Sequence, residues 1–350
     1  MSDQVLTDDL LTMVEGQAGR IRLNRPRAIH ALTTPMCTAM IAALQGWRGD
    51  PGVELVMIDH AEGRGFCAGG DVVHASTDPV AAAVFFHEEY RLNHLLFTYA
   101  KPSIAFMDGV TMGGGVGISQ PCKYRVATEN TLFAMPETGI GLFPDVGGGW
   151  YLSRLPGATG PYLALTGARL DGAECLALGL ATHYVPSEAL AGLKDAIARE
   201  PRRGEALLAD AAIEPPAAGI LANQPMIDRL FAHRRYEDVL AALADDPSQW
   251  AEATLGTLRR KSPQSCKVSL RLVLDGRGRA DFADEMRAEY GIAVHVCQRP
   301  DFREGVRALL VDRDNRPVWN PATPEAVTDH MIDTIFTPLP DAEAWTPLGR

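Results

Sequence analysis

Blocks of positive charge are missing from this sequence. Among its 350 residues, 33 are Lys or Arg and 44 are Asp or Glu, which gives a formal net charge of −11. No run of Lys or Arg interrupts this acidic balance. Because nucleic acids and anionic membrane surfaces bind clustered cations, we expect neither as a partner.

Long apolar runs and paired cysteines are also missing. No stretch approaches the roughly 20 apolar residues of a membrane-spanning helix. Residues 1–16 carry acids where a secretory signal peptide needs a basic start and an apolar run. The six cysteines are scattered without a CxxC pair: Cys37, Cys67, Cys122, Cys175, Cys266 and Cys297. This pattern predicts reduced thiols in a cytoplasmic protein, with no disulfide framework and no metal site.

The first half of the chain alternates short apolar runs with a helical pattern. Residues 10–16 and 19–26 predict a strand hairpin, and the apolar runs at 53–61 and 101–109 predict further strands. Residues 33–47 predict a helix with Thr34 as its N-cap and Pro35 in the first turn. Strand, helix and strand in this order predict parallel pairing and an α/β core.

The second half is mostly helical in pattern. From about Pro161 the apolar spacing favours helices almost to the end of the chain. Residues 214–225 (EPPAAGILANQP) are rich in Pro and Ala and predict a loop. We therefore expect a sheet-bearing N-terminal half under a helical C-terminal half.

Two glycine-rich turns each follow a predicted strand. They are residues 63–72 (GRGFCAGGDV) and 107–119 (MDGVTMGGGVGIS). Without a Cβ the backbone can approach a ligand closely, so each turn can offer a bare N–H to a carbonyl oxygen, as an oxyanion hole requires. Neither turn matches a P-loop or the dinucleotide-binding GxGxxG pattern, and the chain has no GxSxG nucleophile elbow. Tight turns with close helix packing are the alternative explanation.

Three acids stand in unusual surroundings. Glu137 and Asp145 lie in an otherwise Gly-, Pro- and apolar-rich run, residues 135–157, with no Lys or Arg before Arg154. Glu89 occupies the apolar stripe of a long helix predicted at 78–102, whose other members are Phe85, Leu92, Leu96 and Tyr99. A buried carboxylate must be paired, hydrogen-bonded or protonated. The alternative for Glu89 is a position at the edge of the stripe, from which it reaches solvent.

Taken together, these segments resemble the enoyl-CoA hydratase/isomerase (crotonase) superfamily. The resemblance begins at residues 23–32 (LNRPRAIHAL) and continues through both glycine turns and residues 135–157. It implies an α/β fold with a crotonase-like (ββα)n spiral core and a helical C-terminal region. The core, with the CoA site and the oxyanion hole, would occupy residues 1–200, and residues 201–350 would cover or flank the active site.

Within the superfamily, the chain resembles the 3-hydroxyisobutyryl-CoA hydrolase branch, which comprises thioesterases of valine breakdown. Asp145 stands where hydratases usually have glycine, and Glu89 stands at the acidic position of the branch's helix. Residues 262–273 and 301–321 extend the resemblance towards the C-terminus. The resemblance implies an acyl-CoA substrate, no cofactor apart from the coenzyme A of that substrate, and a possible homo-oligomer.

The resemblance also assigns backbone roles. The N–H groups of Gly70 and Gly114 would form the oxyanion hole for the thioester carbonyl. Main-chain atoms around Arg27, Ala28, Ala68 and Gly70 would contact the adenine and pantetheine parts of CoA.

The acids receive their roles in the same way. Glu137 corresponds to a catalytic glutamate that hydratases share, whereas their second glutamate would fall at Gly117 and is absent. Glu137 would therefore work with Asp145 and Glu89 in thioester hydrolysis. A hydratase or double-bond isomerase that uses Glu137 alone is one alternative, and a non-catalytic acyl-CoA-binding protein is another.

Overall fold

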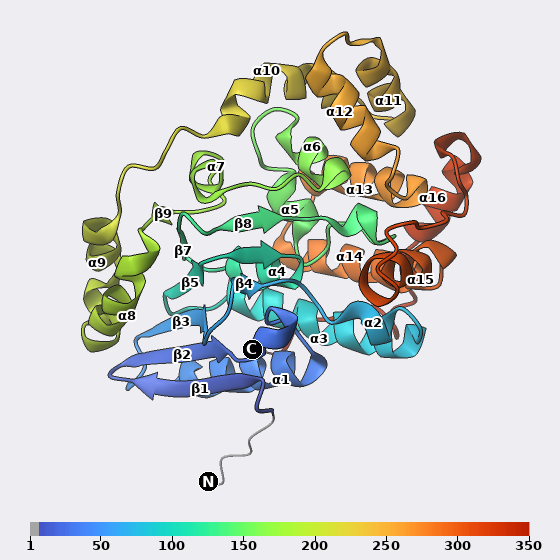
Figure 1. The fold of residues 1–350 in the computed structure, drawn as a ribbon. Helices are drawn as coiled ribbons and strands as arrows, with labels where there is room; N and C mark the ends of the chain where they lie inside the picture. The colour runs from blue at the N-terminus through green and yellow to red at the C-terminus, as the bar shows by residue number, and fades with distance from the viewer. Residues whose placement is uncertain (1–6, 350) are drawn as a thin grey trace.

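The computed structural model describes residues 7–349. Residues 1–6, on which part of the expectation about the N-terminal segment rests, lie outside the described residues. The strands form the centre of the molecule, and helices surround them on several sides (Figure 1). Within residues 7–349, no helix is both long enough and apolar enough to cross a lipid bilayer.

The strands form two sheets. The larger sheet has the order β1 (Leu10–Glu15), β2 (Ala18–Leu23), β3 (Leu55–His60), β5 (Ser103–Met107), β7 (Tyr124–Ala127), β9 (His183–Tyr184). The smaller sheet has the order β4 (Gly65–Cys67), β6 (Val110–Met112), β8 (Leu132–Ala134). β1 and β2 form an antiparallel hairpin, and every other named pair is parallel. The predicted hairpin and the predicted parallel α/β core are both confirmed.

The chain winds through the two sheets as a spiral. β3, β5 and β7 each enter the larger sheet, and the strand that follows each of them enters the smaller one. The three strands of the smaller sheet are parallel, so their carboxyl ends meet at one edge. The segments that follow these strands are therefore brought together, although they lie far apart in the sequence.

The helices of the first 200 residues surround this spiral. They are α1 (Thr34–Arg48), α2 (Val72–Ala75), α3 (Pro79–Phe97), α4 (Gly114–Ser119), α5 (Gly148–Leu152), α6 (Thr159–Thr166), α7 (Gly172–Ala177) and α8 (Leu190–Arg199). Short helical turns add η1 (Pro26–Ala28), η2 (Glu137–Gly139) and η3 (Ser187–Ala189). In α1 the hydroxyl of Thr33, not of Thr34, accepts the cap hydrogen bond from the N–H of Met36. The predicted N-cap was wrong by one residue, because Thr34 already has its place in the first turn.

Residues 201–349 are mostly helical. The helices are α9 (Gly204–Ala211), α10 (Gly219–Phe231), α11 (Tyr236–Asp245), α12 (Gln249–Leu258), α13 (Pro263–Gly276), α14 (Phe282–Cys297), α15 (Pro300–Val306) and α16 (Asp329–Ile335). The turns η4 (Pro201–Arg203) and η6 (Pro324–Ala326) and the π-helical turn η5 (Arg307–Val311) accompany them. The division of the chain at residue 200 stays a prediction.

The loop predicted at residues 214–225 is wrong over its second half. Helix α10 begins at Gly219 and continues through Pro225. Its buried face, which includes Ile220 and Ile227, packs against α6. This burial outweighs the hydrogen bond that Pro225 removes from the helix interior, an example of tertiary packing overriding local propensity.

Two clusters of buried side chains hold the layers together. The larger one is a single cluster whose members range from Leu10 in β1 to Trp345 near the C-terminus. The C-terminal helices therefore share their core with the spiral. The smaller one lies between the larger sheet and the helices α8 and α9, which Figure 1 shows on the left. Helix α3, which lies on one face of the spiral, packs against α14.

Candidate active site

A cavity of about 260 Å³ lies at the edge where the strands of the smaller sheet end. Segments that follow β4, β6 and β8 line it, together with α3 and η5. The cavity contains Ala68, Gly70, Gly114, Glu89, Glu137 and Asp145 among its lining residues. Six of the residues that the sequence singled out are therefore gathered in one place.

The two glycine turns lie side by side in this cavity. Gly70 follows β4 and Gly114 opens α4 after β6, and these strands are parallel neighbours. Gly69 and Gly113 have φ values of +121° and +46°, which favour glycine at both positions. Among the described residues, no backbone carbonyl accepts a hydrogen bond from the N–H of Gly70 or of Gly114. Both groups are free to donate to a ligand, as an oxyanion hole requires.

Glu89 and Glu137 flank the second glycine turn. Their exposed fractions are 1% and 4%. A Cβ built on Gly113 would lie 3.1 Å from Glu137 Oε1, and one built on Gly114 would meet Glu89 Oε1. Among the described residues, the other oxygen of Glu137 (Oε2) has no hydrogen-bond partner, and neither has Glu89 Oε1. Buried polar atoms normally have partners, so these two oxygens are available to a substrate.

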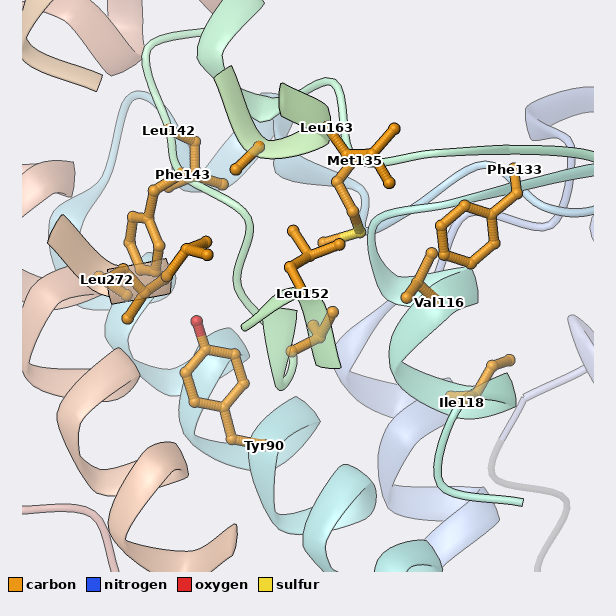
Figure 2. Close-up of a cluster of buried hydrophobic side chains, with 14 of the residues drawn as sticks. Tyr90, Val116, Ile118, Phe133, Met135, Leu142, Phe143, Leu152, Leu163 and Leu272 are labelled. Carbon is orange, nitrogen blue, oxygen red and sulfur yellow. The ribbon is translucent and has the colours of Figure 1, made fainter. Parts of the chain in front are cut away.

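Asp145 is held by a phenol. Tyr90 Oη donates to Asp145 Oδ2 over 2.8 Å, and both side chains are buried. Figure 2 shows Tyr90 extending from α3 with its hydroxyl directed towards the chain that carries Phe143. The carboxyl of Asp145 is thus fixed in orientation by a residue on the same helix as Glu89.

Burial shifts the pKa of all three acids. Desolvation raises the pKa of Asp145 to about 7, against the lowering effect of the Tyr90 hydrogen bond. It raises the pKa of Glu137 well above its usual range, and the charge of Asp145 adds to this effect. The pKa of Glu89 is raised by burial and then by Asp145 and Glu137. The three carboxyls therefore oppose one another's ionisation, so that the ionised form of one raises the pKa of the others.

The raised pKa of Asp145 gives the free energy of unfolding a pH dependence. The pKa is about 7 in the folded chain and roughly 3.9 in an unfolded one. Between these values the folded chain binds more protons at this group, so its contribution to stability is complete below the unfolded pKa and is lost as the pH rises through the folded pKa. We expect the unfolding free energy of wild type minus that of Asp145→Asn to fall between about pH 4 and about pH 8.

Urea unfolding of both proteins across that range checks this expectation. The difference between the two proteins cancels the titrating groups that do not interact with Asp145. A difference that stays constant, or rises with pH, would contradict the raised pKa.

Gly117 has no room for a side chain. A Cβ there would lie 2.6 Å from Val146 Cβ and 2.8 Å from Asn93 Nδ2. Real Cβ atoms do not approach other heavy atoms so closely, and all three residues are buried. The position that the resemblance assigns to the second hydratase glutamate is therefore occupied by the loop after Asp145 and by α3.

Two of the predicted CoA contacts lie outside the cavity. Arg27 is exposed and Ala28 is half-buried in η1. The next residue, Ile29, accepts a hydrogen bond from the N–H of Ala68 over 2.9 Å. η1 therefore lies beside the cavity wall, and the contacts of Arg27 and Ala28 with CoA stay a prediction.

The cysteines have a structural role. All six are buried, free thiols. Cys67, the last residue of β4, donates a hydrogen bond to the carbonyl of His30, and burial raises its pKa to about 12. A thiol that stays protonated at neutral pH is not an activated nucleophile.

Several residues at the site were not found from the sequence. Leu309 and Leu310 of η5 complete the cavity wall from the C-terminal half. Lys261 lies beside η2, since a Cβ built on Gly139 would be 3.4 Å from Lys261 Nζ. The positive charge of Lys261 lowers the pKa of Glu137. These residues belong to segments that only the tertiary fold brings to the site. Tyr90 is the neighbour of Glu89, but no sequence signal pairs it with Asp145.

Comparisons with known proteins give a family and close relatives. Residues 18–336 match a family described as enoyl-CoA hydratase/isomerase. The chain is 42% identical over 356 residues to the mitochondrial 3-hydroxyisobutyryl-CoA hydrolase of Xenopus laevis, covering 97% of this chain and 91% of that protein. It is 41% identical over 335 residues to 3-hydroxyisobutyryl-CoA hydrolase 1 of Arabidopsis thaliana, covering 90% and 88%.

A solved structure agrees with the fold. It is described as a carnitinyl-CoA dehydratase from Mycobacterium thermoresistibile and superimposes with a TM-score of 0.93 at 37% identity, covering 98% of this chain and 100% of that one. The predicted crotonase-like α/β fold with a helical C-terminal region is confirmed. The names of the relatives differ in reaction, so the site itself must distinguish hydrolysis from hydration.

Proposed function

Because the chain belongs to the enoyl-CoA hydratase/isomerase family, we propose that it is an acyl-CoA thioester hydrolase acting on 3-hydroxyisobutyryl-CoA. The observation that carries the proposal is the pair Glu137 and Asp145, buried in one cavity with both glycine turns. The crowding at Gly117 supports it further, since it leaves no place for a second hydratase glutamate. The relatives of plant and frog with the hydrolase name match nearly the whole chain.

The thioester carbonyl would lie between the glycine turns. The N–H groups of Gly70 and Gly114 would stabilise the oxyanion that develops as the carbonyl carbon becomes tetrahedral. In other enzymes one such donor contributes about 3–4 kcal/mol to the transition state. Coenzyme A enters as part of the substrate, and the proposal requires no separate cofactor.

The carboxyls would supply the proton transfers. An ionised Glu137 would either take a proton from water or attack the carbonyl carbon to form an anhydride that water then opens. In both routes the carbon–sulfur bond breaks, and a neutral carboxyl of the trio would protonate the departing thiolate. Asp145, oriented by Tyr90, would bind the 3-hydroxyl of the acyl group or share in the proton transfer, with Glu89 in support.

The acyl group is the least constrained part of the proposal. 3-Hydroxyisobutyryl and 3-hydroxypropionyl thioesters differ by one methyl, which a pocket distinguishes by only about 1–3 kcal/mol. The valine-breakdown role follows from the first of these substrates.

We also propose that the protein is cytoplasmic, since all six cysteines are free thiols. The Xenopus laevis relative, in contrast, is named as mitochondrial. Fractionation of cells that produce the native chain would check this location.

Release of free thiol from 3-hydroxyisobutyryl-CoA, followed with a thiol reagent, tests the hydrolase directly. We expect turnover of this thioester and little change in the enoyl absorbance of crotonyl-CoA. Loss of that absorbance without thiol release would favour the second candidate, a hydratase or isomerase, which the dehydratase name of the similar solved structure suggests. Tight binding of CoA esters with no turnover of any thioester would favour a non-catalytic binding protein.

A further inference from the structure

The chain turns sharply after Asp145. Val146 has a φ of +54° and Gly147 a φ of +92°. A positive φ is uncommon for any residue with a Cβ and is an outlier for a β-branched one. Such a conformation persists only where the surrounding structure fixes it. The turn that carries Asp145 therefore needs contacts that hold it.

Glu289 of α14 provides these contacts. Its Oε2 accepts the N–H of Gly147 over 2.7 Å, and its Oε1 accepts the N–H of Gly149 over 3.0 Å. The side chain is fully buried. Both oxygens of one carboxylate are thus used on two amides that lie two and four residues after Asp145.

The same helix supports the other residue that holds Asp145. α14 packs along α3, which carries Tyr90, and also contacts α5, which begins at Gly148. The rings of Tyr90 and Tyr290 meet edge to face with centroids 6.4 Å apart. The backbone of the Asp145 turn and the hydroxyl that orients its carboxyl therefore both rest on α14.

We propose that Glu289 is a positioning residue that fixes the carboxyl of Asp145 for catalysis by holding the amides of Gly147 and Gly149. The inference rests on the proposed function of Asp145. Glu289 lies outside the cavity lining and acts on the reaction only through the turn. Loss of these two hydrogen bonds would let Asp145 move away from Tyr90 and from the substrate. The proposed CoA contacts at the first glycine turn would stay in place.

Asp284 provides the control. It lies on α14 like Glu289, but its side chain is 42% exposed. Its Oδ1 accepts a hydrogen bond from Arg287 Nη1 over 2.9 Å. Asp284→Asn removes a charge from the same helix, whereas the buried Glu285 is no control, because a Cβ on Gly149 would meet its Oε1. Glu289→Gln keeps the shape of the side chain but places an NH₂ group against one of the two amides.

Kinetics of thiol release from 3-hydroxyisobutyryl-CoA test the positioning role. We expect Glu289→Gln to lower kcat about ten- to a hundredfold, the effect of a small misplacement of a catalytic group, and to change KM little. Asp284→Asn should leave both within about twofold. In an Asp145→Asn background, Glu289→Gln should lower kcat by less than about twofold, because the group that it positions is already lost. An equal loss in both backgrounds would overturn the inference.

Hydrogen exchange tests the contact without activity. We expect Glu289→Gln to speed exchange at the amides of Gly147 and Gly149, and Asp284→Asn to leave them protected. Unchanged exchange in Glu289→Gln would overturn the inference whatever the kinetics show. If the wild-type protein releases no thiol from any thioester, the proposed function fails, and the exchange result still decides whether Glu289 holds the turn.

Discussion

Glu137→Gln is expected to slow thiol release from 3-hydroxyisobutyryl-CoA by about a thousandfold, within the range of about 10²–10⁴ that loss of a general base produces. Glu137 lines the cavity beside the glycine turns, and its Oε2 has no partner among the described residues. The amide keeps the shape of the side chain but can neither take a proton from water nor attack the thioester. The measurement is kcat at saturating substrate, with thermal unfolding to show that the variant is folded.

Glu88→Gln is the control for this substitution. Glu88 lies on α3 next to Glu89, but its carboxylate contacts Arg91 over 3.1 Å and is absent from the cavity lining. We expect its kcat to stay within about twofold of wild type, as for other substitutions away from a site. If Glu137→Gln lost no more activity than Glu88→Gln, Glu137 would not carry the chemistry.

Asp145→Asn is expected to lower the same rate by about a hundredfold, because proton transfer through this carboxyl is lost. Asparagine retains an oxygen that can accept the hydrogen bond from Tyr90, so the loss reports the ionisable group rather than its orientation. The variant should still bind CoA esters, since the glycine turns are unchanged. Initial rates over a range of substrate concentrations separate kcat from KM.

Tyr90→Phe is the matched comparison. It removes the hydroxyl that orients Asp145 and that lowers its pKa, while the carboxyl remains. We expect a smaller loss of kcat than in Asp145→Asn and a pH–rate profile in which Asp145 ionises at higher pH. Full thiol release by Asp145→Asn would remove the reason for assigning the chain to the hydrolase branch. A gain of crotonyl-CoA hydration would point to the second candidate.

Local sequence signals predicted most of the fold around the site. The helix predicted at 78–102 begins with Asp78, whose Oδ1 accepts the N–H groups of Val80 and Ala81 at the start of α3. The apolar stripe of α3 placed Glu89 inside, where it is 1% exposed. These predictions succeeded because a cap and a 3.6-residue period depend on neighbours in the chain.

The same kind of signal is present on α14. Phe282, Met286, Ala293 and Val296 form a buried stripe that includes Glu289. An acid within an apolar stripe indicated a buried carboxylate here as it did on α3. Its partners are the amides of a turn about 140 residues earlier, and nothing in the sequence indicates that distance.

The sequence by itself determined the parts that depend on local chemistry: the alternation of strands and helices that predicts parallel pairing, the glycine turns after β4 and β6, and the identity of the acids. Only the tertiary structure decided which of these parts meet. Parallel strands place the segments after β4, β6 and β8 at one edge, and α3 and η5 close the cavity over them. Burial in that cavity then raises the pKa of the three acids, a property that no carboxyl has in the extended chain.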